Sequence, residues 1–364
     1  MMTRKPGGPV ALAILVGGAA FASAAGAEIV YTETNSANGN AVQIYQSAPD
    51  GSLTLTSTVG TSGLGTGAGL GNQGALALGG GDRWLYAVNA GSNDISVFAV
   101  SDAGLTLVDR VSSGGTMPIS LTAHDQLLYV LNAGDTGNIT GFRTGHDGHL
   151  HAIPNSTRPL SSSSAGAAQV GFDGDGDALV VTEKATNRIS TYSLVNDRPT
   201  GPVLHTSNGM TPFGFAFDRR DTLLVSEAFG GHANAAALSS YDLDEPGSLN
   251  VISGSVPAAQ TAACWVVVAR HGRYAYITNT GSGTVTGFRV ARSGALTRLS
   301  ADGVSGVTGG GPTDAGATRD GRKLFVLSPS IGQIVNFQVN EDGSLLKLGS
   351  TPGAPPTATG VVVR

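Results

Sequence analysis

The sequence predicts an all-β fold, a seven-bladed β-propeller, and three observations lead to this interpretation. Short runs of alternating apolar and polar residues follow one another along the chain, and no stretch has the pattern of a long helix. Hairpin turns that end in glycine recur at a regular spacing. The two ends of the chain carry strands that complement each other. Together these features predict a ring of small antiparallel sheets.

The spacing of the turn glycines sets the number of blades. In each repeat an apolar strand, such as residues 95–100, is followed by a hairpin turn and then by a second alternating strand. Six intervals separate Gly51 from Gly343, which gives about 49 residues per repeat. Seven turns of this kind occur, and their glycines are Gly51, Gly104, Gly148, Gly201, Gly247, Gly294 and Gly343.

Two further strands precede this hairpin in each repeat. One has an aliphatic and aromatic core followed by a polar residue, as in residues 85–89, 128–132, 275–279 and 324–328. Before it lie a polar turn, such as residues 319–322, and a short strand of small residues. Four strands in each of seven repeats are typical of a propeller.

The ends of the chain predict how the ring closes. Residues 29–31 match the second strand of a repeat, so the first blade lacks its innermost strand. Residues 358–363 match that missing strand. We therefore expect the two termini to share a blade, which removes the last exposed sheet edge. The propeller domain is expected to cover residues 28–364.

Residues 1–27 are predicted to be a removable export signal. Basic residues precede an apolar stretch over residues 10–21, which is too short to span a bilayer, and small residues end the segment at Ala27. A cleavage site ending at Ala24 is the alternative. No later segment is apolar over the roughly 18 residues that a membrane helix needs. We therefore expect a secreted or periplasmic protein without a membrane span.

The composition argues against several kinds of partner. The formal net charge is −5 and only 13% of residues are charged, whereas about 25% is usual in a soluble domain. A nucleic-acid-binding protein needs a basic surface to displace counterions, so that class is disfavoured. We expect a monomer with no cofactor and no bound metal ion.

Two motifs that suggest a ligand are better explained as turns. The acidic run 173–177 resembles a calcium loop, but Ala178 and Lys184 stand where that loop needs glycine and glutamate. Glycines over residues 69–74 have the spacing of a dinucleotide site, but they lead into a strand and not into a phosphate-binding helix. We expect that segment to be a glycine-rich connection between blades.

The strand order predicts a ligand site on one face. If the first strand of each blade lines a central channel, all second strands end on the face that carries the loops between blades. The predicted ends are polar: Thr34, Asn89, Asn132, Glu183, Glu227, Asn279 and Ser328. Glu183 and Glu227 belong to adjacent blades. The cationic side chains expected nearest to them are Lys184, Arg188 and His232.

Two interpretations of the paired acids remain open at this point. Polar residues at strand ends commonly accept hydrogen bonds from loop N–H groups, and a glutamate can do so as an asparagine does. Alternatively, two acids close together raise the pKa of one of them, as a general acid or base requires. His205 and Asp314 are further candidates for the same opening.

These repeats resemble the secreted β-propeller lactonase family with its YVTN-like repeats, which includes 6-phosphogluconolactonase-like and carboxymuconate-cyclising proteins. The resemblance spans residues 28–364 and is carried by the second strands, by the third strands SNDISVF and GTVTGFRV, and by turns such as DGSL at 342–345. It implies a seven-bladed propeller that acts on a small molecule.

The resemblance also implies where chemistry would lie. In the family it is associated with a His-rich segment before the first strand of blade four, a Gly-Pro-Arg-His-like segment before that of blade five, and a Glu at the end of the second strand of blade five. Glu227 matches this Glu. Residues 164–169 and 211–214 stand at the other two places and contain neither histidine nor arginine.

Two functions follow as hypotheses. An enzyme would hydrolyse or isomerise a lactone or sugar acid, with Glu227 activating water and Glu183 as its polar partner. Negative charge would be stabilised, and the ligand bound, by Lys184, Arg188, His232, Asn89, Asn132 and Asn279. The alternative is a non-catalytic propeller that binds a ligand or a protein. A protein partner predicts an exposed apolar patch around Phe213, Phe215 and Phe229.

Overall fold

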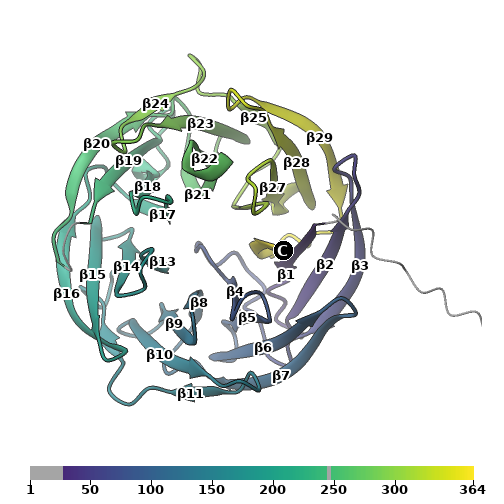
Figure 1. Cartoon of the computed structure of the whole chain (residues 1–364), viewed down its shortest axis with the longest axis vertical. Helices are drawn as coiled ribbons and strands as arrows, with labels where there is room; N and C mark the ends of the chain where they lie inside the picture. The colour runs from purple at the N-terminus through teal and green to yellow at the C-terminus, as the bar shows by residue number, and fades with distance from the viewer. Residues whose placement is uncertain (1–27, 244–246) are drawn as a thin grey trace, which may run out of the picture.

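Seven antiparallel sheets surround a central axis in the computed structural model, which describes residues 28–243 and 247–364 (Figure 1). Each sheet forms one blade, with one strand next to the axis and the others following outward. The prediction of an all-β, seven-bladed propeller is confirmed. The short helical turns within the described residues are 3-10 turns at Phe229–Gly231, Arg270–Gly272 and Pro329–Ile331.

Blades one to four succeed one another around the ring, and the strands of each follow from the innermost to the outermost. Blade one contains β30 (Thr359–Val363), β1 (Ile29–Glu33), β2 (Ala41–Ser47) and β3 (Leu53–Gly60). Blade two contains β4 (Leu76–Gly79), β5 (Trp84–Asn89), β6 (Asp94–Ser101) and β7 (Gly104–Ser112). Blade three contains β8 (Pro118–His124), β9 (Leu127–Asn132), β10 (Asn138–Thr144) and a divided outer strand, β11 (Leu150–Ala152) and β12 (Arg158–Pro159). Blade four contains β13 (Ala167–Phe172), β14 (Ala178–Glu183), β15 (Arg188–Val195) and β16 (Arg198–Thr206).

Blades five to seven complete the ring in the same order. Blade five contains β17 (Pro212–Phe217), β18 (Leu223–Glu227), β19 (Ala237–Asp242) and β20 (Asn250–Pro257). Blade six contains β21 (Ala263–Ala269), β22 (Tyr274–Asn279), β23 (Thr284–Val290) and a divided outer strand, β24 (Leu296–Arg298) and β25 (Gly306–Val307). Blade seven contains β26 (Asp314–Ala317), β27 (Lys323–Ser328), β28 (Gln333–Val339) and β29 (Leu345–Pro352).

The two ends of the chain close the ring as predicted. β30 pairs antiparallel with β1, so that Val30 lies opposite Val363 and Tyr31 opposite Val362. Reciprocal backbone hydrogen bonds between Ile29 and the last residue of the chain continue this ladder, at 3.0 and 2.8 Å. The inner edge of β1 is therefore paired and does not face solvent.

The turn glycines have the backbone conformation that their role requires. All seven have a positive φ, between 78° at Gly294 and 115° at Gly104. Gly343 also allows a close approach between blades, because a Cβ atom there would lie 2.5 Å from Cε1 of Tyr274. Glycine is thus required at this turn both for its conformation and for space.

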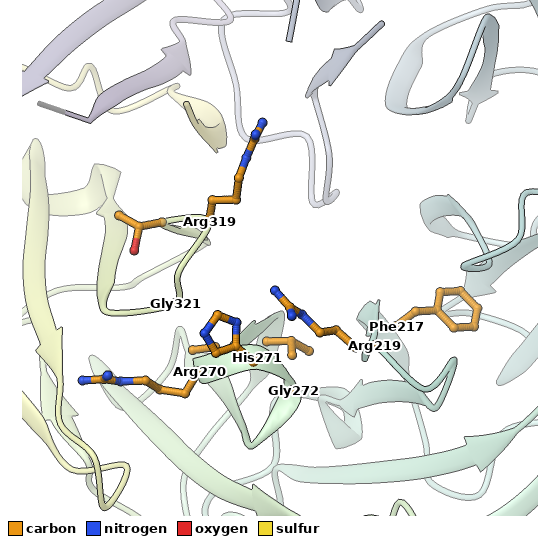
Figure 2. Close-up of a pocket in the computed structure, with 10 residues that line it drawn as sticks. Phe217, Arg219, Arg270, His271, Gly272, Arg319 and Gly321 are labelled. Carbon is orange, nitrogen blue, oxygen red and sulfur yellow. The ribbon is translucent and has the colours of Figure 1, made fainter. Parts of the chain in front are cut away.

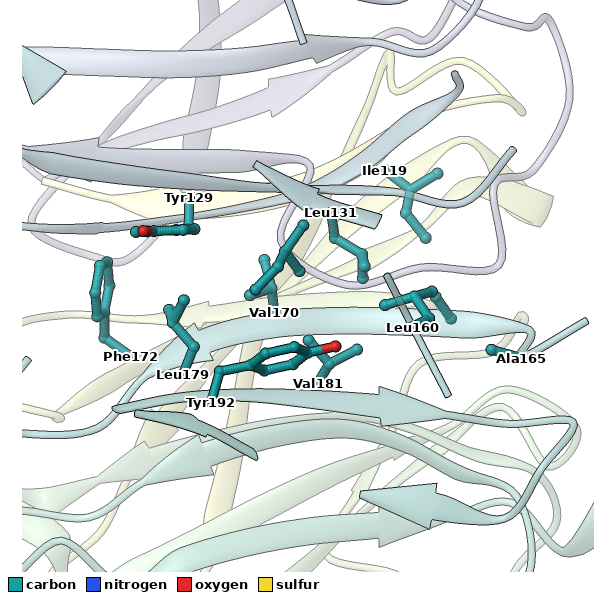
Figure 3. Packing of buried hydrophobic residues seen from close by; sticks show 12 residues of the cluster. Ile119, Tyr129, Leu131, Leu160, Ala165, Val170, Phe172, Leu179, Val181 and Tyr192 are labelled. Atoms are coloured by element: carbon teal, nitrogen blue, oxygen red, sulfur yellow. The ribbon is translucent and has the colours of Figure 1, made fainter. Parts of the chain in front are cut away.

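The hydrophobic core is divided into layers between neighbouring blades. One such cluster, shown in Figure 3, joins blades three and four and includes Tyr129, Phe172 and Tyr192. The rings of Tyr129 and Phe172 meet edge to face with their centroids 5.8 Å apart, a preferred aromatic geometry. Because second strands lie between two such layers, every residue of β14 is buried.

The second strand of blade one ends one residue earlier than the sequence predicts. We expected Thr34 at this position, but β1 ends at Glu33, which pairs with Val42 on β2. Thr34 lies in the following loop. The residue equivalent to the paired acids is therefore a third glutamate, which the sequence comparison of the strand ends did not identify.

The predicted export signal at residues 1–27 lies outside the described residues. Within residues 28–243 and 247–364, no helix combines the length and the apolar character needed to cross a bilayer.

Candidate functional site

The two faces of the disc carry different connections. The loop face carries the links between blades and the ends of the second strands. The turn face carries the hairpins between first and second strands, such as the one between β26 and β27. We call the seven residues at the second-strand ends the rim: Glu33, Asn89, Asn132, Glu183, Glu227, Asn279 and Ser328.

All seven rim residues are 0% exposed. Glu183 and Glu227 do lie on the same face in adjacent blades, because they end the equivalent strands β14 and β18. The loop-face rim is therefore a ring of buried polar groups. What each carboxylate can do depends on its hydrogen-bond partners.

Glu227 is held by three donors. It accepts hydrogen bonds from the N–H group of Gly209 at 2.8 Å and from the hydroxyls of Ser239 at 2.5 Å and Ser255 at 2.6 Å. Burial raises the pKa of the Glu227 carboxyl, and the hydrogen bonds from the two serines and Gly209 oppose this rise. The raised pKa thus has desolvation as its main cause.

Glu183 is held in the same way. Its carboxylate accepts hydrogen bonds from the N–H group of Ser161 at 3.1 Å and from the hydroxyls of Thr186 and Ser190, each at 2.8 Å. The hydroxyl of Ser161 is a further donor to the second oxygen. Both acids therefore have the bonding of strand-end caps, with loop N–H groups and hydroxyls as their partners.

The rim asparagines show that this bonding is a property of the repeat. Asn89 donates to the hydroxyl of Ser96 at 2.8 Å and Asn279 to that of Thr286 at 2.9 Å, as Ser190 donates to the carboxylate of Glu183. In these three blades the partner lies seven residues after the rim residue, on the third strand. The same spacing joins Glu33 to Asn40, whose amide donates at 2.9 Å. Asn132 instead bonds the side chain of Asn138, at 2.9 Å.

The predicted cations do not reach the paired acids. Lys184 donates through Nζ to the carbonyl of Gly71, and its ammonium lies 4.6 Å from the centroid of the Phe213 ring. Burial lowers the pKa of Lys184. Among the described residues, Arg188 and His232 form no side-chain hydrogen bond or ion pair with Glu183 or Glu227.

His205 does not lie at the opening as suggested, and the phenylalanines do not form the exposed patch that a protein partner would require. His205 lies on β16, the outermost strand of its blade, where Nε2 is 3.0 Å from the hydroxyl of Thr191. It does not face the channel. Phe215 is buried, and Phe213 and Phe229 are half-buried, so these rings form no fully exposed apolar patch.

A segment of the chain spans the channel at the loop face. We call residues 70–74 the plug. Gln73 donates from its N–H group to the carbonyl of Ala168 at 3.0 Å and from its side chain to that of Thr313 at 3.1 Å. Asn72 accepts from Thr359 at 3.0 Å. These partners lie at the starts of inner strands in blades four, seven and one, on different sides of the axis.

The sequence identified the plug only as a connection between blades. It does connect β3 to β4, as expected, but it also occupies the channel opening. Gln73 is completely buried. A Cβ atom on Gly214 would come within 2.9 Å of its Oε1 atom. No sequence pattern indicated the position of the plug, because it depends on partners between 47 and 287 residues away.

A cavity of about 200 Å³ opens on the opposite, turn face. Three hairpins from blades five, six and seven line it (Figure 2): Phe217, Arg219, Val268, Ala269, Arg270, His271, Gly272, Thr318, Arg319 and Gly321. The lining contains three arginines and a histidine but no acid. The sequence analysis noted residues 319–322 only as a polar turn, although the neighbouring turn also carries consecutive cationic residues.

Comparison with known protein families gives a match to part of the chain. The model of a family described as lactonase, 7-bladed beta-propeller, matches residues 27–159. Over this part the sequence is similar to that family, and the seven-bladed fold agrees with it. No curated protein sequence matches the chain at a significant level.

Several solved structures share the fold of this propeller. A putative 6-phosphogluconolactonase from Bacteroides fragilis is 18% identical, with a TM-score of 0.71 over 94% of this chain and 99% of that one. One from Bacteroides uniformis is 16% identical, with a TM-score of 0.74 over 93% and 99%. A periplasmic gluconolactonase from Pseudomonas aeruginosa is 16% identical, with a TM-score of 0.67 over 93% and 99%. At these identities the likeness concerns the fold.

Proposed function

We propose that this propeller is an exported member of the lactonase family that binds a lactone or a sugar acid and does not hydrolyse it through the rim acids. The observation that carries the proposal is the plug. Gln73 binds the backbone of Ala168, within the segment where the family resemblance implies a histidine. It also contacts the position of Gly214, within the segment where an arginine is implied. The chain itself fills the place where family chemistry would occur.

The state of Glu227 supports the same conclusion. A general base must be within hydrogen-bond reach of the water that it activates. Glu227 has no exposed surface, and its oxygens already accept from Gly209, Ser239 and Ser255. Water could reach this carboxylate only after those donors had separated from it. The turn-face cavity is an accessible concave surface for a small acidic ligand.

Lactone hydrolysis at Glu227 is the second candidate, and two observations favour it. Glu227 occupies the place of the family Glu, and burial raises the pKa of its carboxyl, as a general acid or base requires. In this mechanism Glu183 is its polar partner, and Lys184, Arg188 or His232 stabilises the developing negative charge. The ligand would then contact the rim asparagines: Asn89, Asn132 and Asn279.

A hydrolysis assay separates the two candidates. Hydrolysis of glucono-δ-lactone is measured above the spontaneous rate for the wild type, for Glu227→Gln and for Glu33→Gln, an equivalent rim position in another blade. Binding without hydrolysis predicts no rate above background in any of the three. Catalysis by Glu227 predicts a rate that falls by about a hundredfold or more in Glu227→Gln and persists in Glu33→Gln.

Ligand binding is measured on the same preparations. Gluconate and gluconolactone should raise the melting temperature of the wild type, because a ligand selective for the folded state stabilises it. If no lactone or sugar acid does so and none is hydrolysed, the proposed ligand class is wrong. Export is tested by N-terminal sequencing of the mature protein, which should begin at Glu28, or at Ala25 for the alternative cleavage site.

A further inference from the structure

Three hairpins of the turn face bring cationic side chains to one opening. Arg219 belongs to the β17–β18 turn, His271 to the β21–β22 turn and Arg319 to the β26–β27 turn. Figure 2 shows Arg219 extending towards His271, whereas Arg319 extends away from both and Arg270 points to the other side. Cationic residues from three blades therefore line one cavity, and the guanidinium of Arg319 is turned towards Asp82.

Close backbone contacts fix the three turns against one another. A Cβ atom on Gly321 would lie 2.1 Å from the backbone nitrogen of Arg270, and one on Gly272 would lie 3.6 Å from that of Arg219. The turn of blade seven thus packs on that of blade six, and the turn of blade six on that of blade five. Glycine makes the first approach possible, because no larger residue fits there.

The backbone of the middle turn is in an unfavourable conformation. Arg270 and His271 have φ values of 49° and 60°, in the left-handed region that non-glycine residues rarely adopt. Such strain persists only where surrounding contacts hold it, and it is concentrated at binding and active sites. In this turn it directs His271 to the cavity while Arg270 turns back towards blade seven.

The nearby acids are paired with cations other than those at the opening. Arg270 binds Glu341 at 2.8 Å, and Arg220 is paired with the buried Asp218. Asp320 is paired with Arg322 at 3.5 Å and accepts from the hydroxyl of Thr318 at 2.6 Å. In the part of the chain that the structure describes, the side chains of Arg219 and His271 form no hydrogen bond and no ion pair.

Arg319 has one partner, which a ligand can replace. Its guanidinium is paired with Asp82, but the Arg319 side chain is 85% exposed. An exposed ion pair contributes at most about 1 kcal/mol. A more highly charged anion at the opening therefore competes with Asp82 for this guanidinium.

We propose that Arg219, His271 and Arg319 bind a phosphate group, as the inorganic ion or as the monoester of a small molecule. A phosphate presents three terminal oxygens and close to two negative charges at neutral pH, whereas a carboxylate presents two oxygens and one charge. Arg219 and His271 lie together at the cavity, and Arg319 can join them by turning from Asp82 to the larger anion, since arginine binds phosphate through paired hydrogen bonds. This inference rests on the proposed function, which places the ligand in the turn-face cavity.

Calorimetric titration with inorganic phosphate tests the site, at an ionic strength of about 0.15 M to suppress non-specific binding. The wild type should bind phosphate saturably and at least about tenfold more tightly than acetate. The double variant Arg219→Gln, Arg319→Gln should lose at least about tenfold in affinity. Arg292→Gln is the matched control, since Arg292 is an exposed arginine on the β23–β24 hairpin, outside the cavity lining, and it should bind as the wild type does.

Asp82→Asn should have the opposite effect on the affinity for phosphate. Removing this carboxylate frees the guanidinium of Arg319, so phosphate should bind more tightly. The proposal is overturned if the wild type binds no phosphate, binds acetate equally well, or loses affinity equally in Arg292→Gln and in the double variant. It is also overturned if Asp82→Asn weakens binding. Because inorganic phosphate is the probe, failure of the phosphate site is distinguished from failure of lactone or sugar-acid binding, which is measured separately.

Discussion

The loop face and the turn face differ in how their polar side chains are used. On the loop face the carboxylates of Glu183 and Glu227 are buried and fully bonded by hydroxyl and N–H donors. On the turn face Arg219 and His271 project into a cavity without a partner in the described chain. The sequence pattern indicates the acids of the rim as site candidates, but the side chains available to a ligand are Arg219 and His271 on the turn face.

The largest effect should follow from removing a rim acid. Glu227→Ala leaves the donors of Gly209, Ser239 and Ser255 buried without an acceptor, so the free energy of unfolding should fall by about 3 kcal/mol or more. Urea unfolding measures this loss. Asp175→Ala removes an acid on an exposed turn and should change stability by less than about 1 kcal/mol. A loss at Glu227 as small as that of the control would mean that the rim is not a structural ring.

Stability should also depend on pH through the buried carboxyls. Burial raises the pKa of Glu227 and raises that of Glu33 and Asp314 well above the usual range. A carboxyl group whose pKa is higher in the folded state favours folding while it is protonated. Its contribution is present below the unfolded pKa of about 4 and is lost as pH rises through the folded value.

The neutral variant Glu33→Gln should therefore flatten this pH dependence. We expect the free energy of unfolding of the wild type to fall more steeply than that of Glu33→Gln between about pH 4 and neutrality, as measured by urea unfolding at several pH values. Asp125→Asn, which removes an exposed carboxylate, is the control. Equal slopes for the wild type and Glu33→Gln would show that the buried carboxyl does not titrate in this way.

A smaller effect on stability is expected from truncating the side chain of Gln73 in the plug. Gln73→Ala removes the hydrogen bond to Thr313 and leaves a gap at the loop-face opening, so stability should fall by about 1–2 kcal/mol. Thermal unfolding compares it with Gln126→Ala, an exposed glutamine on the turn face. If Gln73→Ala also produced lactone hydrolysis, the plug would be an inhibitor of a competent rim, and the two faces would have to be reassigned.

The smallest effect on stability is expected at the turn-face cavity. Arg219→Gln and Arg319→Gln should each change the free energy of unfolding by less than about 0.5 kcal/mol, because neither residue is buried or part of a strong ion pair. Urea unfolding checks this. A cost above about 1 kcal/mol would indicate that these arginines support the fold instead of a ligand.

The fold could be predicted because its determinants are local and repeated. Turn glycines such as Gly104 and Gly343 mark each hairpin, and the pattern of second strands such as β9 recurs in every blade. Ring closure could be inferred because residues 358–363 supply the strand that residues 29–31 lack. A shift of one residue, from Thr34 to Glu33, is the error expected where a strand end has several polar residues in succession.

The candidate site could be predicted less completely than the fold, because the exposure of its side chains depends on contacts between residues distant in the sequence. A spacing of seven residues from Glu183 to Ser190 was present in the sequence and could have identified a cap. The plug gave no such indication, since Gln73 meets Thr313 only after the ring has closed. The cavity likewise requires turns of three blades, and none of them is distinctive alone.

The pairing of β1 with β30 has a consequence for the order of folding. Val30 and Val363 are adjacent in space but separated by nearly the whole chain, and such non-local contacts slow folding because a very long loop must be closed first. A ribosome delivers β1 first and β30 last. Until β30 has been made, the first blade keeps an unpaired edge at β1, so the ring cannot close before nearly all of the described chain is available.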